Sequence, residues 1–160
     1  LDLQGNLSLK VPGGTNSNGI CWNAEATLMY YIDTPTQKIL AYPFENETGS
    51  LGEPSLVVDT GMAGWEGSPD GMTIDAAGKL WVAMCHGGSV LRIDPLSGDL
   101  LGQVDFPCVE TTACAFGGPN LERLFVTTGL HKTLEEPDAG KVFVVDGLGI
   151  CGVPSFAYGK

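Results

Sequence analysis

Three oxygen-bearing side chains stand at matching places in the sequence, each immediately before a short apolar run. They are Asn18, Asp70 and Thr111. An amide oxygen, a carboxylate and a hydroxyl are ligands that a hard divalent cation such as Ca²⁺ accepts. A carboxylate beside such a cation can also take a proton from water and return it to a leaving group. The three residue types together indicate a cation site in which Asp70 is the acid/base group.

Each of the three residues also has a purely structural interpretation. Asn-Gly and Asp-Gly are common turn dipeptides. In the structural interpretation, Asn18 and Asp70 stabilise turns and have no further role. Pro69 fixes its own backbone angle, and with Asp70-Gly71 it predicts a rigid turn at the entrance of a β-hairpin. In the same interpretation, Thr111 caps a strand and has no further role. The sequence leaves both interpretations open for every one of them.

The stretch after each of these side chains repeats the same pattern of short apolar runs and turns. A tight turn joins a first run to a second run, and a second hairpin follows. The second runs cover 28–33, 80–83 and 124–127, and the hairpin strands after them cover 39–42, 90–94 and 142–146. The copies begin at positions 18, 70 and 111, which are 52 and then 41 residues apart. Four short strands per unit at this period are typical of a β-propeller blade.

The repeat predicts an all-β chain that forms about three blades of a six-bladed β-propeller, which is a partial propeller. A β-sandwich is the alternative, but it does not need to repeat one turn in one register three times. We expect a single partial propeller domain over 1–160. It should consist of a remnant of a preceding blade at 1–11 and blades at 18–59, 70–106 and 111–155.

In a propeller the innermost strands line the central channel, so the residues that begin them meet at one mouth. Asn18, Asp70 and Thr111 should therefore lie several ångströms apart. Three blades cannot close a ring, because natural propellers have at least about four. The two outer blade faces are then expected to expose apolar surface and to promote self-association.

Two further residues are weaker candidates for the substrate-binding rim of the same pocket. Asp33 ends the second strand of the first copy, and His86 follows the second strand of the next copy. Thr111 is a third weak candidate for contact with a substrate. His86 can equally be an ordinary loop residue, since two glycines follow it. An insertion at 130–140 carries His131 and is expected to form a solvated loop or a lid.

Composition excludes several classes of partner. The net charge is −11 and only 8 residues are Lys or Arg, so nucleic acid would be repelled. No apolar run is long enough to span a bilayer, which predicts no membrane insertion. The cysteine count is odd and no Cys-x-x-Cys occurs, which favours free thiols in a reducing, cytoplasmic compartment over a zinc site. The cysteines are Cys21, Cys85, Cys108, Cys114 and Cys151.

Several longer motifs resemble one known family, the regucalcin family, which is also called the senescence marker protein or gluconolactonase family. The resemblance runs over nearly the whole chain, in the family's order and spacing. The motifs are Asn-Ser-Asn-Gly-Ile-Cys-Trp at 16–22, Tyr-Tyr-Ile-Asp-Thr at 30–34, Pro-Asp-Gly-Met-Thr-Ile-Asp at 69–75, Gly-Lys-Leu-Trp-Val-Ala at 78–83 and Thr-Thr-Ala-Cys-Ala-Phe-Gly-Gly at 111–118.

The resemblance implies a six-bladed propeller that binds one divalent metal in its central channel and hydrolyses sugar lactones. It implies Asn18 and Asp70 as metal ligands and Asp70 as the catalytic acid/base. Ca²⁺ is the first expectation for the metal, with Zn²⁺, Mn²⁺ and Mg²⁺ as alternatives. The family's glutamate ligand and its substrate-holding Arg and Asn belong to an N-terminal half that this sequence does not contain. The chain is therefore expected to be a fragment that is inactive alone.

Two other functions remain open for the same fold. One is a non-enzymatic calcium-binding regulator, which would bind calcium tightly without turning over a lactone. The other is an interaction module of the kind that many propellers provide, which would fold without any metal.

Overall fold

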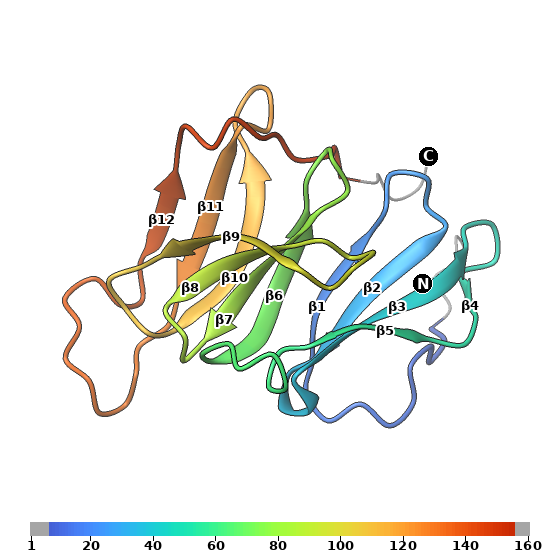
Figure 1. Ribbon diagram of the computed structural model, residues 1–160, viewed down its shortest axis with the longest axis horizontal. Helices are drawn as coiled ribbons and strands as arrows, with labels where there is room; N and C mark the ends of the chain where they lie inside the picture. Colours follow the sequence, from blue (N-terminus) through green and yellow to red (C-terminus); the bar gives the residue numbers. More distant parts are fainter. Residues whose placement is uncertain (1–6, 156–160) are drawn as a thin grey trace.

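Residues 7–155 are described by the computed structural model, and they form an almost purely β structure. The one helical element among them is a short 3₁₀ turn, η1 (Thr34–Thr36). Three twisted antiparallel sheets follow one another along the chain and stand side by side, as Figure 1 shows. The predicted all-β partial propeller is confirmed, and each sheet is one blade.

The blades are called the first, second and third blade in chain order. The first blade contains β1 (Ser17–Trp22), β2 (Leu28–Asp33), β3 (Lys38–Glu45), β4 (Ser50–Leu51) and β5 (Ser55–Asp59), and both β4 and β5 pair with β3. The second blade contains β6 (Ser68–Ile74), β7 (Leu80–Cys85), β8 (Ser89–Ile93) and β9 (Leu100–Asp105). The third blade contains β10 (Thr111–Gly117), β11 (Arg123–Thr128) and β12 (Val142–Val145).

Only three strands form the third blade within residues 7–155, where the repeat predicts four. The segment after β12 leaves the blade and crosses towards the second blade, along the upper edge in Figure 1. There Gly152 forms an isolated bridge with Asp75. The backbone N–H of Ala76 donates to the Cys151 carbonyl at 2.8 Å, and the N–H of Gly152 donates to the Leu121 carbonyl at 2.8 Å. Cys151 and Gly152 thus hydrogen-bond to turns of the second and third blades.

The innermost strands β1, β6 and β10 start at the same edge of their sheets, the lower edge in Figure 1. Asn18-Gly19 lies inside β1 and Asp70-Gly71 lies inside β6. The rigid turn predicted at Pro69-Asp70-Gly71 is therefore wrong, and the turn interpretation of Asn18-Gly19, which the sequence left open, does not hold. The pairing register of both strands shifts at these dipeptides. A register shift of this kind adds an unpaired residue to one strand and re-aims its side chain.

Both glycines are needed because a neighbouring inner strand lies against them. A Cβ on Gly19 would lie 2.6 Å from the Asp70 carbonyl oxygen. A Cβ on Gly71 would lie 2.6 Å from the Ala113 Cα and 2.8 Å from the Thr112 carbonyl oxygen. Such contacts are too short for any larger residue. The missing side chains therefore let the three inner strands approach one another and bring their polar residues together.

We expect Gly71→Ala to destabilise the fold by about 1–3 kcal/mol, because the added methyl group must push β6 and β10 apart. Gly102→Ala is the matched control, since Gly102 also lies in a strand but has open space where its Cβ would be. The control should leave stability within about 0.5 kcal/mol of wild type. Urea unfolding measures both changes, and equal effects would contradict the close-approach argument.

Two hydrophobic cores flank the second blade, and β7 contributes to both. Leu80, Val82 and Met84 face the first blade, whereas Trp81 and Ala83 face the third. All five are buried, which agrees with a strand that is apolar on both faces. The main partners on the first side are Tyr30, Ile32 and Ile39, and those on the other side are Cys114, Leu124 and Val126.

The outer faces of the first and third blades expose large apolar side chains. On the first blade, Ile20 is 47% exposed and Leu56 is 56% exposed. On the third blade, Phe125 and Val144 pair directly across β11 and β12 and are 39% and 47% exposed. Self-association through these faces stays a prediction.

The N-terminal stretch contains no strand over residues 7–16. The remnant of a preceding blade predicted at 1–11 therefore shows no strand over 7–11, and residues 1–6 lie outside the described residues. Between residues 7 and 155, no helix has the length and apolar character needed to cross a membrane.

The cysteines differ in their exposure. Three of them are buried, Cys85 is partly buried and Cys151 is exposed. The three buried cysteines are Cys21, Cys108 and Cys114.

Candidate functional site

Asp70 lies at the centre of a polar cluster to which all three blades contribute. Its carboxyl is half-buried, and burial raises its pKa above the usual range, helped by the negative charge of Glu110. A hydrogen bond from the Asn18 side chain, the polar side chain of Cys85 and the charge of His86 act in the opposite direction. Asn18 belongs to the first blade, Asp70 and Cys85 belong to the second, and Glu110 directly precedes the third. The structure therefore brings Asn18 and Asp70 together.

The Asn18 amide turns its nitrogen towards its neighbours. Its Nδ2 donates to Thr34 Oγ1 at 3.1 Å, and the hydrogen bond from this side chain to the Asp70 carboxyl must also come from Nδ2, so the amide has to turn over before its oxygen can face a cation. Together with the Asp70 carboxylate it offers two hard oxygen donors, which fits Ca²⁺ or Mg²⁺ chemistry. The residues present thus fit the divalent metal that the sequence motifs imply.

Glu110 is a member of the cluster that the sequence analysis missed. Glu110 is 9% exposed, and its backbone forms an isolated β-bridge with Cys85 at the end of β7. The Cys85 thiol donates to Glu110 Oε2 at 2.9 Å, and His86 Nδ1 lies 3.0 Å from Glu110 Oε1. The only feature of the sequence that could have identified Glu110 is its position immediately before Thr111, where the third copy of the repeat begins.

Thr111 serves a different role from the predicted one. It is fully buried, and its hydroxyl oxygen lies 2.7 Å from the Met84 carbonyl and 2.9 Å from the Ser89 carbonyl. The hydroxyl is therefore within hydrogen-bonding distance of carbonyl groups at β7 and β8. Thr111 thus connects the third blade to the second blade. The register shift of β10 falls at Thr112 instead.

Asp33 fastens the loop that precedes β1. Its carboxylate accepts the backbone N–H groups of Asn16 at 2.7 Å and Thr15 at 3.0 Å, and also the Thr15 hydroxyl at 2.8 Å. These hydrogen bonds, with that from Asn16 strongest, lower the pKa of Asp33 below its usual range. The stability they contribute is present above the ordinary Asp pKa and is lost as pH falls through the lowered folded value. Asp33 thus positions the chain that leads to Asn18.

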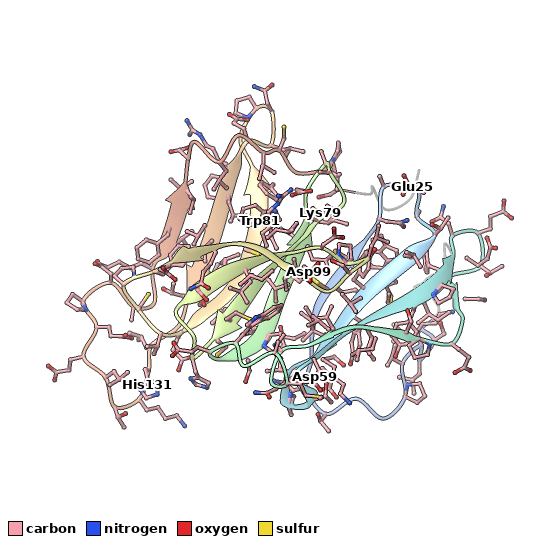
Figure 2. The ribbon with its side chains drawn as sticks, viewed as in Figure 1. Glu25, Asp59, Lys79, Trp81, Asp99 and His131 are labelled. Atoms are coloured by element: carbon pink, nitrogen blue, oxygen red, sulfur yellow. The ribbon has the colours of Figure 1, made fainter. Side chains whose placement is uncertain are left out.

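The two histidines meet at the rim of the cluster. His86 is exposed, and His131 lies on the long loop between β11 and β12, on the lower left in Figure 2. Their rings are 6.0 Å apart and nearly perpendicular, and His131 Nε2 is 3.9 Å from Glu110 Oε1. The loop is also fastened by Glu136, whose Oε1 accepts the Val109 N–H at 3.0 Å. The loop predicted at 130–140 therefore lies against the cluster.

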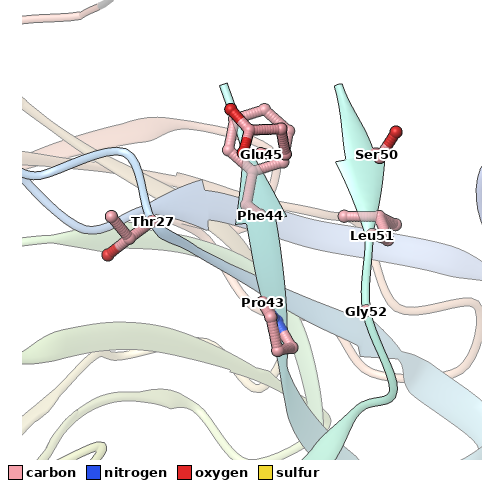
Figure 3. Close-up of a pocket in the computed structure, with 7 residues that line it drawn as sticks. All are labelled: Thr27, Pro43, Phe44, Glu45, Ser50, Leu51 and Gly52. Carbon is pink, nitrogen blue, oxygen red and sulfur yellow. The ribbon is translucent and has the colours of Figure 1, made fainter. Parts of the chain in front are cut away.

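A separate hollow lies beside β3 and β4, as Figure 3 shows. It has a volume of about 280 Å³ and shares no residue with the polar cluster. Glu45 is its one ionisable residue, so it lacks a set of groups that could move protons or hold a metal. It is lined by Thr27, Pro43, Phe44, Glu45, Ser50, Leu51 and Gly52.

Comparison with known proteins gives a consistent set of relatives. The family model described as "SMP-30/Gluconolactonase/LRE-like region" matches residues 1–130. A Bacillus subtilis (strain 168) protein, provisionally named a sugar lactone lactonase, is 39% identical over 148 residues, which are 89% of this chain and 50% of the relative. The chain spans about half the length of the curated relatives it matches.

Two solved structures extend this likeness to the fold. A luciferin-regenerating enzyme matches with a TM-score of 0.89 and 31% identity, over 96% of this chain and 52% of its own. A structure from Agrobacterium tumefaciens, described as a calcium-binding protein, regucalcin, matches with a TM-score of 0.78 and 29% identity, over 86% of this chain and 48% of its own.

Proposed function

Because the chain belongs to the SMP-30/gluconolactonase/LRE-like family, as its motifs predict, we propose that it supplies one side of a site that hydrolyses sugar lactones with a bound divalent cation. The observation that carries the proposal is the pairing of Asn18 with Asp70. Two register shifts and two close-packed glycines on neighbouring inner strands bring these side chains together.

Asn18 and Asp70 are the residues that would hold the cation, with Ca²⁺ as the first choice and Zn²⁺, Mn²⁺ or Mg²⁺ as alternatives. When bound, such a cation supplies polarisation of the lactone carbonyl and stabilisation of the negative charge that develops on its oxygen. Ca²⁺ takes about six to eight oxygen ligands, so water, substrate and further protein oxygens must complete the set.

Asp70 moves the proton in this proposal. The carboxylate accepts a proton from the water that attacks the lactone carbonyl carbon. When the bond between that carbon and the ring oxygen breaks, Asp70 returns the proton to the departing oxygen. The product is an open hydroxy acid, which releases a proton to the solution.

A calcium-binding protein without turnover is the second candidate. It is supported by the description of the Agrobacterium tumefaciens structure as a calcium-binding protein, and the same two oxygen donors would serve it.

Acid release from a panel of sugar lactones, followed across a titration of divalent cation, distinguishes the two functions. The whole protein that carries these residues should hydrolyse a lactone only when a divalent cation is present. Tight calcium binding with no hydrolysis of any lactone would favour the second candidate.

A further inference from the structure

The cluster beside Asp70 contains a second set of possible metal ligands, which is chemically unlike the oxygen pair. The Cys85 sulfur, a ring nitrogen of His86 and a Glu110 carboxylate oxygen all lie within 4.8 Å of one another. Sulfur and imidazole nitrogen are ligands that Zn²⁺ prefers, whereas Ca²⁺ and Mg²⁺ prefer oxygen. The set therefore differs from Asn18 and Asp70 in the cation it selects.

The spacing of the three atoms suits a tetrahedral ion. Ligand atoms around a tetrahedral zinc lie about 3.3–3.7 Å apart, as follows from bond lengths of about 2.0–2.3 Å. The Glu110 oxygens lie 2.9 Å from the Cys85 sulfur and 3.0 Å from His86 Nδ1. These contacts need to open by less than about 1 Å to admit the ion. The side chains are thus already close to a ligating arrangement.

The backbone holds the three residues in place from both sides. His86 has a φ of +64°, in a turn that the Gly87 N–H closes onto the Met84 carbonyl at 2.9 Å. The Glu110 carbonyl accepts the Gly129 N–H at 2.8 Å. Ligands fixed by a rigid backbone lose little conformational freedom when they bind an ion.

We infer that Cys85, His86 and Glu110 form a binding site for Zn²⁺ beside Asp70, with three protein ligands and one open position. This arrangement is the one that zinc adopts where a water or substrate completes the tetrahedron. His131 lies beside the proposed site, with its Nε2 3.9 Å from Glu110 Oε1. The inference does not rest on lactone hydrolysis, and it assigns a metal to a cysteine that the spacing of cysteines in the sequence does not single out.

Cobalt substitution in the reduced 160-residue chain tests this site. Co²⁺ bound to a cysteine thiolate gives a strong near-ultraviolet charge-transfer absorption, so the wild-type chain should show this band, and Zn²⁺ should remove it. Cys85→Ser should abolish the band and weaken Zn²⁺ binding at least about 100-fold, since changes in the shell around a metal's ligands alone cost about 10–100-fold. Cys151→Ser is the matched control, because it removes an exposed thiol, and it should change neither reading.

Two further variants separate this site from the oxygen pair. His86→Asn keeps a residue that tolerates positive φ and should weaken Zn²⁺ binding while the circular dichroism spectrum stays unchanged. Asp70→Asn should leave the cobalt–thiolate band in place, although it weakens the proposed calcium site. Absence of the band in the wild-type chain, or its persistence in Cys85→Ser, would overturn the inference, and the three side chains would then form only a hydrogen-bonded group.

Discussion

Asp70→Asn should lower lactone turnover at least about 100-fold at saturating cation, because a general base contributes about 10²–10⁴ in rate. The substitution keeps the shape of the side chain, so the packing of Pro69 and Gly71 should survive. The amide oxygen can still face a cation, but the amide cannot accept a proton from water near neutral pH. Cation affinity should also fall, because one negative charge leaves the site. Acid release from a lactone, measured on the whole protein that carries these residues, gives both values.

Asn18→Ala is the comparison that separates cation binding from proton transfer. It removes one neutral oxygen donor and leaves the Asp70 base in place, so excess cation should restore part of the activity. No amount of cation should restore Asp70→Asn to the same extent. Near-wild-type turnover of Asp70→Asn at saturating cation would show that Asp70 serves only the backbone of β6, and the catalytic assignment would be wrong.

Asp75→Ala should destabilise the fold by about 3–5 kcal/mol, the range measured when one partner of a buried ion pair is removed. Asp75 is 1% exposed, and its Oδ2 lies 2.8 Å from Arg92 Nε and 3.0 Å from Trp81 Nε1. Its Oδ1 accepts the N–H groups of Ala77 and Lys79 at 2.9 Å each. Alanine leaves these donors and the Arg92 charge without their acceptor. The melting temperature should fall by about 10 °C.

The double variant Asp75→Ala with Arg92→Met checks the cause of this loss. If the unpaired charge is responsible, the double variant should be more stable than Asp75→Ala alone. Lys141→Ala is the control, because it breaks an ion pair with Asp138 whose side chains are 59% and 50% exposed. Such surface pairs contribute about 0–1 kcal/mol. A control as unstable as Asp75→Ala would contradict the argument.

The blades could be predicted from the sequence because a propeller repeats one local pattern. The runs at 28–33, 80–83 and 124–127 became β2, β7 and β11 almost residue for residue. The continuous apolar run at 80–83 agrees with the blades that lie on each side of β7. The third blade could not be predicted in full, since the path after β12 depends on contacts with the turns of other blades.

The candidate site was predicted only in part, for a physical reason that Asp70 and Thr111 illustrate. Asp-Gly is a frequent turn signal, and a sequence does not show that another strand lies against the glycine. The repeat placed Thr111 level with Asp70, but the register shift in β10 falls one residue later, which buries the Thr111 side chain. Glu110 escaped attention because its partners, Cys85 and His86, are 25 and 24 residues away in the chain.

The division of the core by β7 has a consequence for motion. Each seam between blades is closed by one hydrophobic cluster, and the polar cluster around Asp70 lies across both seams. A small rigid-body swing of one blade would separate its donors while every strand stays paired. Collective movements of this kind occur on the microsecond-to-millisecond timescale. A ligand that binds donors from two blades should restrict this movement. Its binding should therefore slow amide hydrogen exchange in β1 and β10 more than in β7, which is already buried between the two other blades.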